Sequence, residues 1–312
     1  MNLPLLARLA VPYARLELPG WGRVLRAAGV LDDDATGRWA DAPTVTVRGK
    51  LHRYQMTLDL SNWSERRTFF LARFYDLPTQ LFVKQFVRLG DSFVDVGGNI
   101  GMITLLAARR VGASGRVHTF EPNPAAFERL RAAIEANALA HVTARPLALS
   151  DAPGELTLSV LHNHTGMGTL APLPEKDRAK VTGHYTVPVA RGDDVLPPRL
   201  RGPLTIKIDV EGYECHALRG LGATIDRLRP AVVAEALPQT LSRAGESVES
   251  LCGLMHCHGY ATYALDLAPA GLRYRLGLAP VPPGTTPTSS NLVFIHPDSE
   301  HGHRLEAWRR GR

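Results

Sequence analysis

A short apolar run, Ser92–Val96, leads directly into a glycine-rich turn, Gly97–Gly101, and then into a stretch with helical periodicity, Met102–Arg110. Glycines at a strand-to-helix turn let the backbone approach a ligand where a Cβ atom would clash. The helix that follows offers the unpaired N–H groups of its first turn to that ligand. The chain is therefore constrained to contain a βα unit with a ligand site at its turn.

The same alternation of apolar runs and helical patterns continues after Gly90, which is typical of βα units and a parallel sheet. We expect helices at 124–137, with Asn123 as N-cap, and at 246–258. The expected strands are 92–96, 117–120, 142–149, a short added strand at 156–160, 204–210, 231–236, 260–265 and 291–296. Residues 161–203 carry weak patterns and are too long for a plain connection, so we predict a functional flap.

The chain divides into three parts on these patterns. Residues 1–89 form an amino-terminal extension of short helices and a β-hairpin with its turn near Gly49, expected to cap the acceptor side. Residues 90–298 form the ligand-binding α/β domain, and residues 299–312 are a basic tail expected to be frayed and solvated.

The ligand of the glycine turn is predicted from the residues around it. Glu121, at the end of the second strand, can accept hydrogen bonds from both hydroxyls of a ribose, which implies a nucleoside. The G-x-G-x-x-G register of a dinucleotide site is broken by Val96 and Asn99. Asp95 would crowd a pyrophosphate but suits the cationic amino end of S-adenosylmethionine. This favours S-adenosylmethionine and leaves a nicotinamide dinucleotide as the alternative.

A second polar segment, Lys207–Glu214, follows an apolar strand. On an extended chain Lys207, Asp209 and Glu211 share one side. Charges on a central strand are costly unless they are paired and open to a cleft. Ligands bind at the carboxyl ends of such strands, so we predict these three side chains to be functional.

Bulk properties exclude several other classes of protein. The net charge is +6, but only five of the 36 basic residues are lysines and the arginines are scattered, so we expect no nucleic-acid partner. Three cysteines are too few for a disulfide framework, which favours the cytoplasm. No metal is predicted, although Asp209, Glu211 and Glu235 could supply oxygen ligands if the fold brought them together.

The amino terminus is apolar but is interrupted by Arg8, Pro12 and Arg15. It falls short of the roughly 20 apolar residues that span a bilayer, so we expect no stable membrane insertion. A short helix packed on the domain and a peripheral contact with a membrane remain as alternatives.

Residues 54–297 resemble the FkbM-type methyltransferases. The matching stretches are Asp91–Gly101, Phe120–Pro124, Ala148–Asp151, Lys207–Glu214, Arg229-Pro230 and Asn291–Phe294. The resemblance implies a class I methyltransferase fold: a Rossmann-like sheet, mostly parallel with a final antiparallel strand, and helices on both faces. It also implies S-adenosylmethionine as methyl donor and an oxygen nucleophile as acceptor.

The resemblance also assigns cofactor-binding residues by position. The methionine part would lie at Asp95, Gly97, Gly98, Asn99 and Gly101, and the ribose at Glu121 with Pro122 and Asn123 beside it. Ser150 and Asp151 would lie near the adenine.

Methyl transfer from a sulfonium to an alcohol is an in-line displacement that benefits from a base. Asp209 or Glu211 is the predicted base, with Lys207 orienting it or lowering its pKa. His162 and His164 in the flap are further candidates. A group of aromatic residues with a nearby carboxylate either lines the acceptor pocket or staples the extension to the domain: Trp63, Phe69, Phe70, Tyr75 and Glu65.

The predicted activity is thus O-methylation of a hydroxyl on a small-molecule natural product or a glycan. Two alternatives remain: an NAD(P)-dependent oxidoreductase and a non-catalytic protein that binds the cofactor as a scaffold. The sequence leaves the acceptor and the oligomeric state open, a homodimer included.

Overall fold

The computed structural model describes residues 5–31, 37, 39–161, 166, 168–200, 202–271, 273–287 and 289–311. Its centre is an eight-stranded sheet of order β13-β12-β14-β11-β10-β3-β4-β5. These strands are β3 (Ser92–Val96), β4 (Arg116–Phe120), β5 (Val142–Arg145), β10 (Leu204–Ile208), β11 (Ala231–Glu235), β12 (Ala261–Ala270), β13 (Arg273–Val281) and β14 (Asn291–Ile295).

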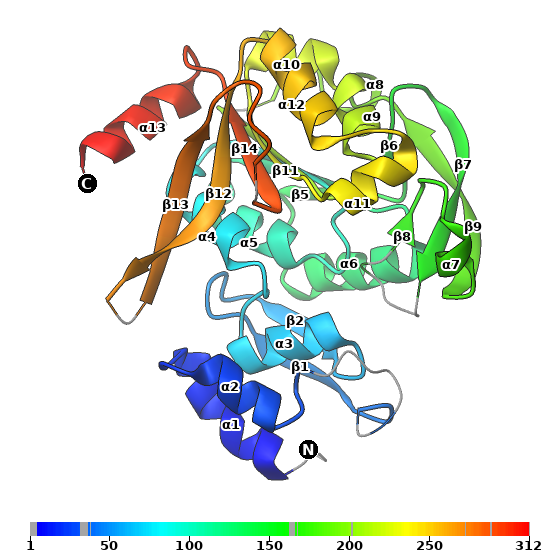
Figure 1. The fold of residues 1–312 in the computed structure, drawn as a ribbon, viewed down its shortest axis with the longest axis vertical. Coiled ribbons are helices and arrows are strands. Elements are labelled where there is room, and N and C mark those ends of the chain that lie inside the picture. Colours follow the sequence, from blue (N-terminus) through cyan, green and yellow to red (C-terminus); the bar gives the residue numbers. More distant parts are fainter. Residues whose placement is uncertain are drawn as a thin grey trace.

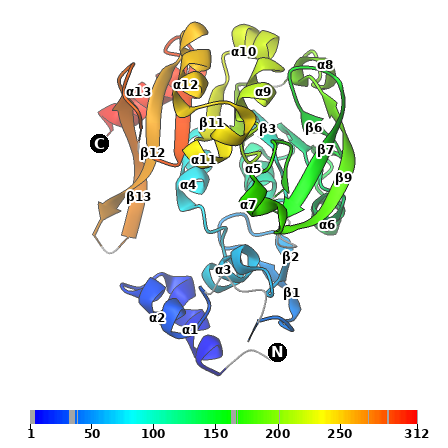
Figure 2. The same cartoon turned by 45° about the vertical axis from the view of Figure 1, so that its right-hand side comes forward.

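Five neighbouring strands, from β5 to β11, run parallel, and β14 is antiparallel to both β11 and β12. This is the predicted fold class, a mostly parallel Rossmann-like sheet with a final antiparallel strand, β14; the edge strand β13, which was not predicted, runs in the same direction as β14. Both faces of the central strands are buried, because helices cover each side (Figures 1 and 2).

Alternate residues of β3 show how the two faces are filled. Phe93 packs toward one core, which includes α5 (Met102–Val111). Val94 and Val96 point to the other face, against α9 (Glu214–Arg219), α10 (Gly222–Leu228) and α12 (Val248–Cys257). A third apolar cluster joins α4 (Leu77–Phe86) and α13 (Glu300–Arg310) to β11 and β14. Helix α6 (Pro124–Ala136) has the predicted cap, with the Asn123 side chain accepting from the Ala125 N–H.

The amino-terminal extension holds the expected short helices and hairpin. They are α1 (Leu5–Leu16), α2 (Trp21–Ala27), β1 (Thr44–Arg48), β2 (Gln55–Asp59) and α3 (Trp63–Leu71). Arg66 of α3 is fully buried, lies 4.8 Å from the centre of the Trp39 ring, and donates to the carbonyl oxygens of Val30 and Leu60. A buried guanidinium with this many partners ties α3 to the preceding segment. None of the described helices is both long and apolar enough to cross a membrane.

A second, four-stranded sheet of order β6-β9-β7-β8 occupies much of the predicted flap. Its strands are β6 (Ala148–Leu149), β7 (Gly154–Leu161), β8 (Gly168–Thr169) and β9 (Val181–Ala190). The short helices α7 (Glu175–Arg178) and α8 (Gly192–Val195) flank it, and α11 (Pro238–Leu241) with η1 (Ser242–Ala244) follows β11.

The weak patterns across 161–203 therefore did not reveal the strands and short helices that its described residues form. Strand β9 escaped prediction because half of its side chains are exposed and Pro188 interrupts its pattern. Proline is tolerated there because β6 pairs only with Val189 and Ala190, which leaves that side of Pro188 unpaired.

Three other boundaries differ from the sequence prediction. The expected strand 142–149 is split, because Pro146 cannot donate to the ladder and the chain leaves the main sheet at Arg145. Strand β13 was missed, since Gly277 and Pro280 weaken its pattern and are tolerated at the edge of the sheet. The basic tail is not frayed: it forms α13, whose Arg304 is paired with buried Asp91.

Candidate functional site

The glycine turn follows β3 at the carboxyl edge of the sheet, as predicted. Gly97 has φ +79°, and a Cβ atom there would lie 2.0 Å from the carbonyl oxygen of Asp209. The two crossing segments can approach this closely only without a side chain at that position. A Cβ at Gly98 would lie 2.1 Å from the Thr119 hydroxyl, and Gly101, at φ +96°, sits directly before α5.

Glu121 is placed at the end of β4, beside the glycine turn. Its Oε2 accepts from the backbone N–H of Asn99 at 2.7 Å, and its Oε1 accepts from the N–H of Asn123 at 2.8 Å. Burial raises the pKa of this carboxyl to about 7, with the two backbone N–H groups acting in the opposite direction. Each oxygen keeps a second lone pair, so both can still accept a hydroxyl from a ligand.

Asp95 and Lys207 form a buried pair beneath the turn. Asp95 is fully buried, its Oδ2 accepts from the Thr104 hydroxyl at 2.6 Å, and its Oδ1 lies 3.4 Å from Lys207 Nζ. Lys207 also donates to the carbonyl oxygen of Gly97 at 2.7 Å. The carboxyl of Asp95 has no exposed surface, so in this structure it holds Lys207 and Thr104 rather than facing the cleft. Burial lowers the pKa of Lys207, but the carboxylates of Asp209 and Asp95 outweigh it and raise the pKa.

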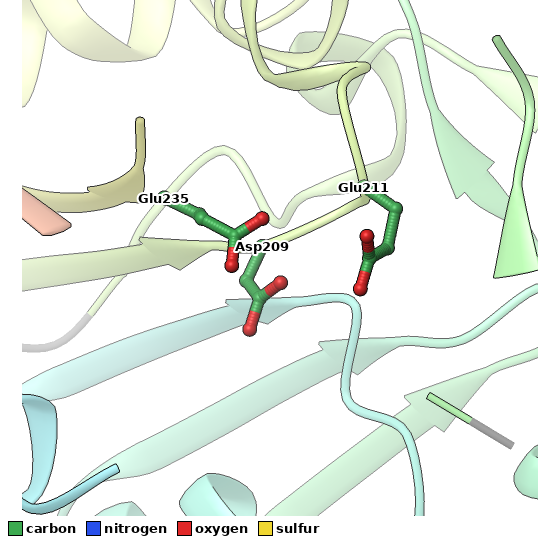
Figure 3. Close-up of side chains that lie close together, drawn as sticks. All are labelled: Asp209, Glu211 and Glu235. Carbon is green, nitrogen blue, oxygen red and sulfur yellow. The ribbon is translucent and has the colours of Figure 1, made fainter. Parts of the chain in front are cut away.

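Three carboxyl groups converge beyond the ends of β10 and β11. One oxygen each of Asp209, Glu211 and Glu235 lie within 4.8 Å of one another (Figure 3). Lys207 Nζ lies 3.6 Å from Asp209 Oδ2 on one side of this group. The strand ends at Ile208 and Glu211 has φ +55°, so the predicted proximity of Asp209 and Glu211 comes from a turn rather than from strand alternation. We call these three residues the carboxylate cluster.

Burial and mutual repulsion raise the pKa values of two carboxyl groups of the carboxylate cluster. Burial, followed by the charge of Asp209, raises the pKa of Glu211 to about 8 and that of Glu235 to about 10. Glu235 Oε2 is buried and has no hydrogen-bond partner among the described residues. A cluster of this kind holds shared protons near neutral pH, and its oxygens are also of the type that binds Mg²⁺ or Ca²⁺.

A cleft joins the glycine turn to the carboxylate cluster. Its wall includes Gly97, Asn99, Glu121, Pro122, Asp209 and Glu211, together with Leu149, Leu158, Gly168, Leu170 and Tyr213. The Thr169 hydroxyl on β8 donates to the carbonyl oxygen of Glu211 at 2.8 Å, which holds the second sheet against this wall. The described part of the predicted flap thus covers one side of the cleft.

The remaining predicted residues lie at or outside this wall. Ser150 is buried, and Asp151 Oδ2 lies 3.0 Å from Nδ1 of His216, whose ring stacks 4.1 Å from that of Tyr213. Asp151 is therefore linked to the cleft indirectly, through His216 and then Tyr213, which lines the cleft. His162 and His164 lie outside the described residues.

The aromatic residues of the extension divide into two groups. Phe69 and Phe70 are buried in the core, and Glu65 is paired with Arg129 at 2.5 Å, so these three staple the extension to the domain. Tyr75 is 40% exposed and lies 5.3 Å from the Trp63 ring. Burial of its hydroxyl and the charge of Asp209 raise the pKa of Tyr75.

Two residues of the site, Glu235 and Tyr213, were given no catalytic or cofactor-binding role from the sequence. Glu235 ends the apolar run Ala231–Glu235, and a polar residue at the carboxyl end of a strand is the same signal that singled out Asp209. Tyr213 lies within the Lys207–Glu214 segment, but a single tyrosine in a turn has no pattern that assigns it to a wall.

Comparison with known proteins identifies the domain around this cleft. The family model described as "Methyltransferase FkbM domain" matches residues 95–261, more than half of the 312 residues. Methyltransferase 1 of Beauveria bassiana is 33% identical over 147 residues, which are 42% of this chain and 59% of that protein. Hexuronic acid methyltransferase AglP of Haloferax volcanii is 28% identical over 148 residues, 46% of this chain and 55% of that protein. The chain therefore spans little more than half the length of these relatives.

Among solved structures, that of methyltransferase FkbM from Methylobacillus flagellatus is 15% identical. The match covers 76% of this chain and 54% of that protein's chain, with a TM-score of 0.39. The strand order and directions given above, rather than this likeness, establish the fold.

Proposed function

The chain belongs to the FkbM methyltransferase family, and from that premise we propose that it transfers a methyl group from S-adenosylmethionine to an oxygen of a hydroxylated acceptor. The observation that carries the proposal is the continuous cleft between Glu121 and the carboxylate cluster. One end offers a ribose acceptor at a glycine turn, and the other offers proton acceptors.

In this proposal the donor lies across the glycine turn. Gly97 and Asn99 form the floor, both oxygens of Glu121 accept the ribose hydroxyls, and Tyr213 stands at the opposite wall. S-adenosylmethionine supplies an electrophilic methyl group on a sulfonium sulfur. Asp95 acts indirectly, because it positions Lys207 beneath the turn.

We assign the general base to Glu211. It lines the cleft, and a pKa of about 8 makes it a stronger base than an ordinary carboxylate while leaving roughly a tenth of it ionised at pH 7. Glu211 would accept the proton of the acceptor hydroxyl, whose oxygen would take the methyl group that bound S-adenosylmethionine supplies, with S-adenosylhomocysteine leaving. Asp209, held by Lys207, keeps Glu211 basic by repulsion.

The acceptor is proposed to be a sugar or another polyhydroxylated small molecule. Carboxylates accept hydrogen bonds from neighbouring hydroxyls, and the partly exposed Tyr75 beside Trp63 offers an aromatic face that a sugar ring could pack against. The relative from Haloferax volcanii, whose name states hexuronic acid as its substrate, supports this class.

The test is label transfer from radiolabelled S-adenosylmethionine to a panel of hexuronic acids, neutral hexoses and hydroxylated non-sugar compounds. We expect labelled product with at least one polyhydroxylated acceptor, with the methyl group on oxygen, and loss of the product in Glu211→Gln. Label on nitrogen or carbon would refute O-methylation. Binding of NAD(P) in place of S-adenosylmethionine would favour the oxidoreductase alternative, and cofactor binding without transfer to any acceptor would favour the scaffold.

A further inference from the structure

Helix α1 is packed with its small side chains inward and its large ones outward. Ala7, Ala10 and Ala14 are buried against the extension, whereas Leu6, Leu9 and Leu16 are 65%, 67% and 70% exposed. An ordinary surface helix buries its largest apolar residues instead. The arrangement leaves the leucines facing solvent with no described residues over them.

These leucines form a continuous stripe together with Tyr13. Spacings of three, four and three residues from Leu6 through Leu9 and Tyr13 to Leu16 place all four on one side of the helix. Leu6, Leu9 and Tyr13 also line an apolar groove shared with Val24 and Ala27 of α2. We call the stripe and this groove the leucine face.

Exposed apolar residues are otherwise scarce on the described surface. Eight large hydrophobic side chains are exposed there, and four of them fall in α1 and the turn after it, because Leu18 joins the three leucines of the helix. Single exposed leucines need no explanation, but a contiguous group marks an interaction surface. Figures 1 and 2 show α1 and α2 together at the lower end of the molecule, beyond α3 and the hairpin β1–β2.

The charge around the leucine face is positive. Arg8 on α1 and Arg23 and Arg26 on α2 are exposed. The only acidic residue within 5–31 is Glu17, and it is paired with Lys50 and Arg73. Asp32–Asp34, next in the sequence, lie outside the described residues.

The positive charge decides which kind of partner can cover the leucine face. A two-fold contact between two copies would set the leucine face against itself and bring like-charged arginines together. An anionic lipid surface satisfies both features, because its acyl region takes the leucines and its headgroups pair with the arginines. We propose that α1 and α2 dock this protein on anionic membranes through the leucine face, lying in the interface without crossing it.

The test is co-sedimentation of the full chain with vesicles of phosphatidylcholine alone and of phosphatidylcholine mixed with phosphatidylserine. We expect binding to the mixed vesicles only, and its loss at about 1 M salt, where the Debye length falls to about 3 Å. The triple variant Leu6→Ser, Leu9→Ser, Leu16→Ser should bind at least about tenfold more weakly, since burying one leucine alone is of the order of tenfold. The variant Arg8→Glu, Arg23→Glu, Arg26→Glu should lose the preference for phosphatidylserine.

Leu89→Ser is the matched control, because Leu89 is 76% exposed but lies outside the leucine face. It should bind vesicles as the wild type does. All variants should keep the wild-type circular dichroism and the wild-type affinity for S-adenosylhomocysteine, which separates this inference from the proposed methyl transfer. Equal binding by the triple variant and the wild type, or no binding of wild type to either vesicle, would overturn the proposal. So would a wild-type dimer in solution that the triple variant dissociates, because the leucine face would then join two copies.

Discussion

The carboxylates at the two ends of the cleft differ in the groups that surround them. At the donor end, Glu121 accepts two backbone N–H groups and Asp95 is paired with Lys207 and Thr104. At the acceptor end, Asp209, Glu211 and Glu235 face one another, with Lys207 beside Asp209 and a buried oxygen on Glu235 that has no hydrogen-bond partner among the described residues. Hydrogen bonds fix the carboxylates of the donor end, whereas the three carboxyl groups of the acceptor end lie close enough to repel one another when they are ionised.

The difference separates two tasks that one sheet edge must perform. A donor site gains from rigid acceptors placed before the ligand arrives, since little is lost on ordering them. A base must instead be poised to take a proton, and crowding among carboxylates raises its pKa toward neutral. In the proposed function, β3 and β4 therefore carry donor binding, and the ends of β10 and β11 carry proton transfer.

The largest effect should come from Glu211→Gln. Removing the base should lower kcat by about 10²–10⁴-fold and abolish the rise of kcat with pH that ends near the wild-type pKa of about 8. Affinity for S-adenosylhomocysteine should stay at the wild-type value, because the donor end is separate. Rates across pH with an acceptor from the panel measure this. Glu175→Gln, at an exposed position of α7, is the control. A retained pH rise in Glu211→Gln would remove Glu211 from this role.

Lys207→Met should damage both ends, because the ammonium group is shared between Asp95 and Asp209. Leaving the buried carboxylate of Asp95 without its cation should lower the free energy of unfolding by about 3–5 kcal/mol. Chemical denaturation measures the loss, and Lys84→Met, exposed on α4, should have little effect. If Lys207→Met were as stable as the wild type, the two ends would not depend on a common cation.

Glu121→Gln should affect the donor end alone. Loss of a charged hydrogen-bond acceptor costs about 1.5–3 kcal/mol, so affinity for S-adenosylhomocysteine should fall by about 10–100-fold. In the wild type, affinity should rise as pH increases through about 7, because the carboxylate is the better ribose acceptor. Equilibrium dialysis of labelled ligand across pH tests both points. Glu128→Gln on the exposed face of α6 is the control, and a pH-independent affinity of the wild type would contradict the assignment.

The smallest effect concerns stability at the acceptor end. The pKa of Glu235 is raised from 4.5 to about 10, and that of Glu211 from 4.5 to about 8. Between pH 4.5 and these raised values, the folded state binds more protons than the unfolded state. Their contribution to stability is present below about pH 4.5 and is lost as pH rises through the raised values. Glu235→Gln should therefore unfold with a shallower pH dependence and be more stable than wild type at pH 8. Thermal denaturation from pH 5 to 9 measures this, and an unchanged slope would show that Glu235 carries no extra proton.

The sequence predicted the parts of this site that local patterns determine. The glycine turn, Glu121 and the Lys207–Glu214 segment were found because each follows an apolar strand, and parallel strands bring their carboxyl ends to one edge. The strands with continuous apolar runs, such as β3 and β10, were placed within two residues or fewer.

Features that depend on tertiary contacts were not predicted. Asp95 was expected to face the ligand, yet its burial against Lys207 follows from the pairing of β3 with β10, which no local pattern encodes. In the second sheet, β7 was predicted as the short strand 156–160, but β9 was missed because half of its side chains are exposed and Pro188 interrupts its pattern. The pKa of Glu211 likewise depends on Asp209 and on burial by distant segments rather than on its neighbours in sequence.

The most direct test of the central claim is isothermal titration calorimetry of the wild-type protein with S-adenosylmethionine, beside NAD and NADP. The account predicts binding of S-adenosylmethionine alone, in the micromolar range, a free energy of roughly −8 kcal/mol. A well-folded protein that binds no S-adenosylmethionine, or that binds a nicotinamide dinucleotide instead, would contradict the assignment of this cleft to a methyl donor.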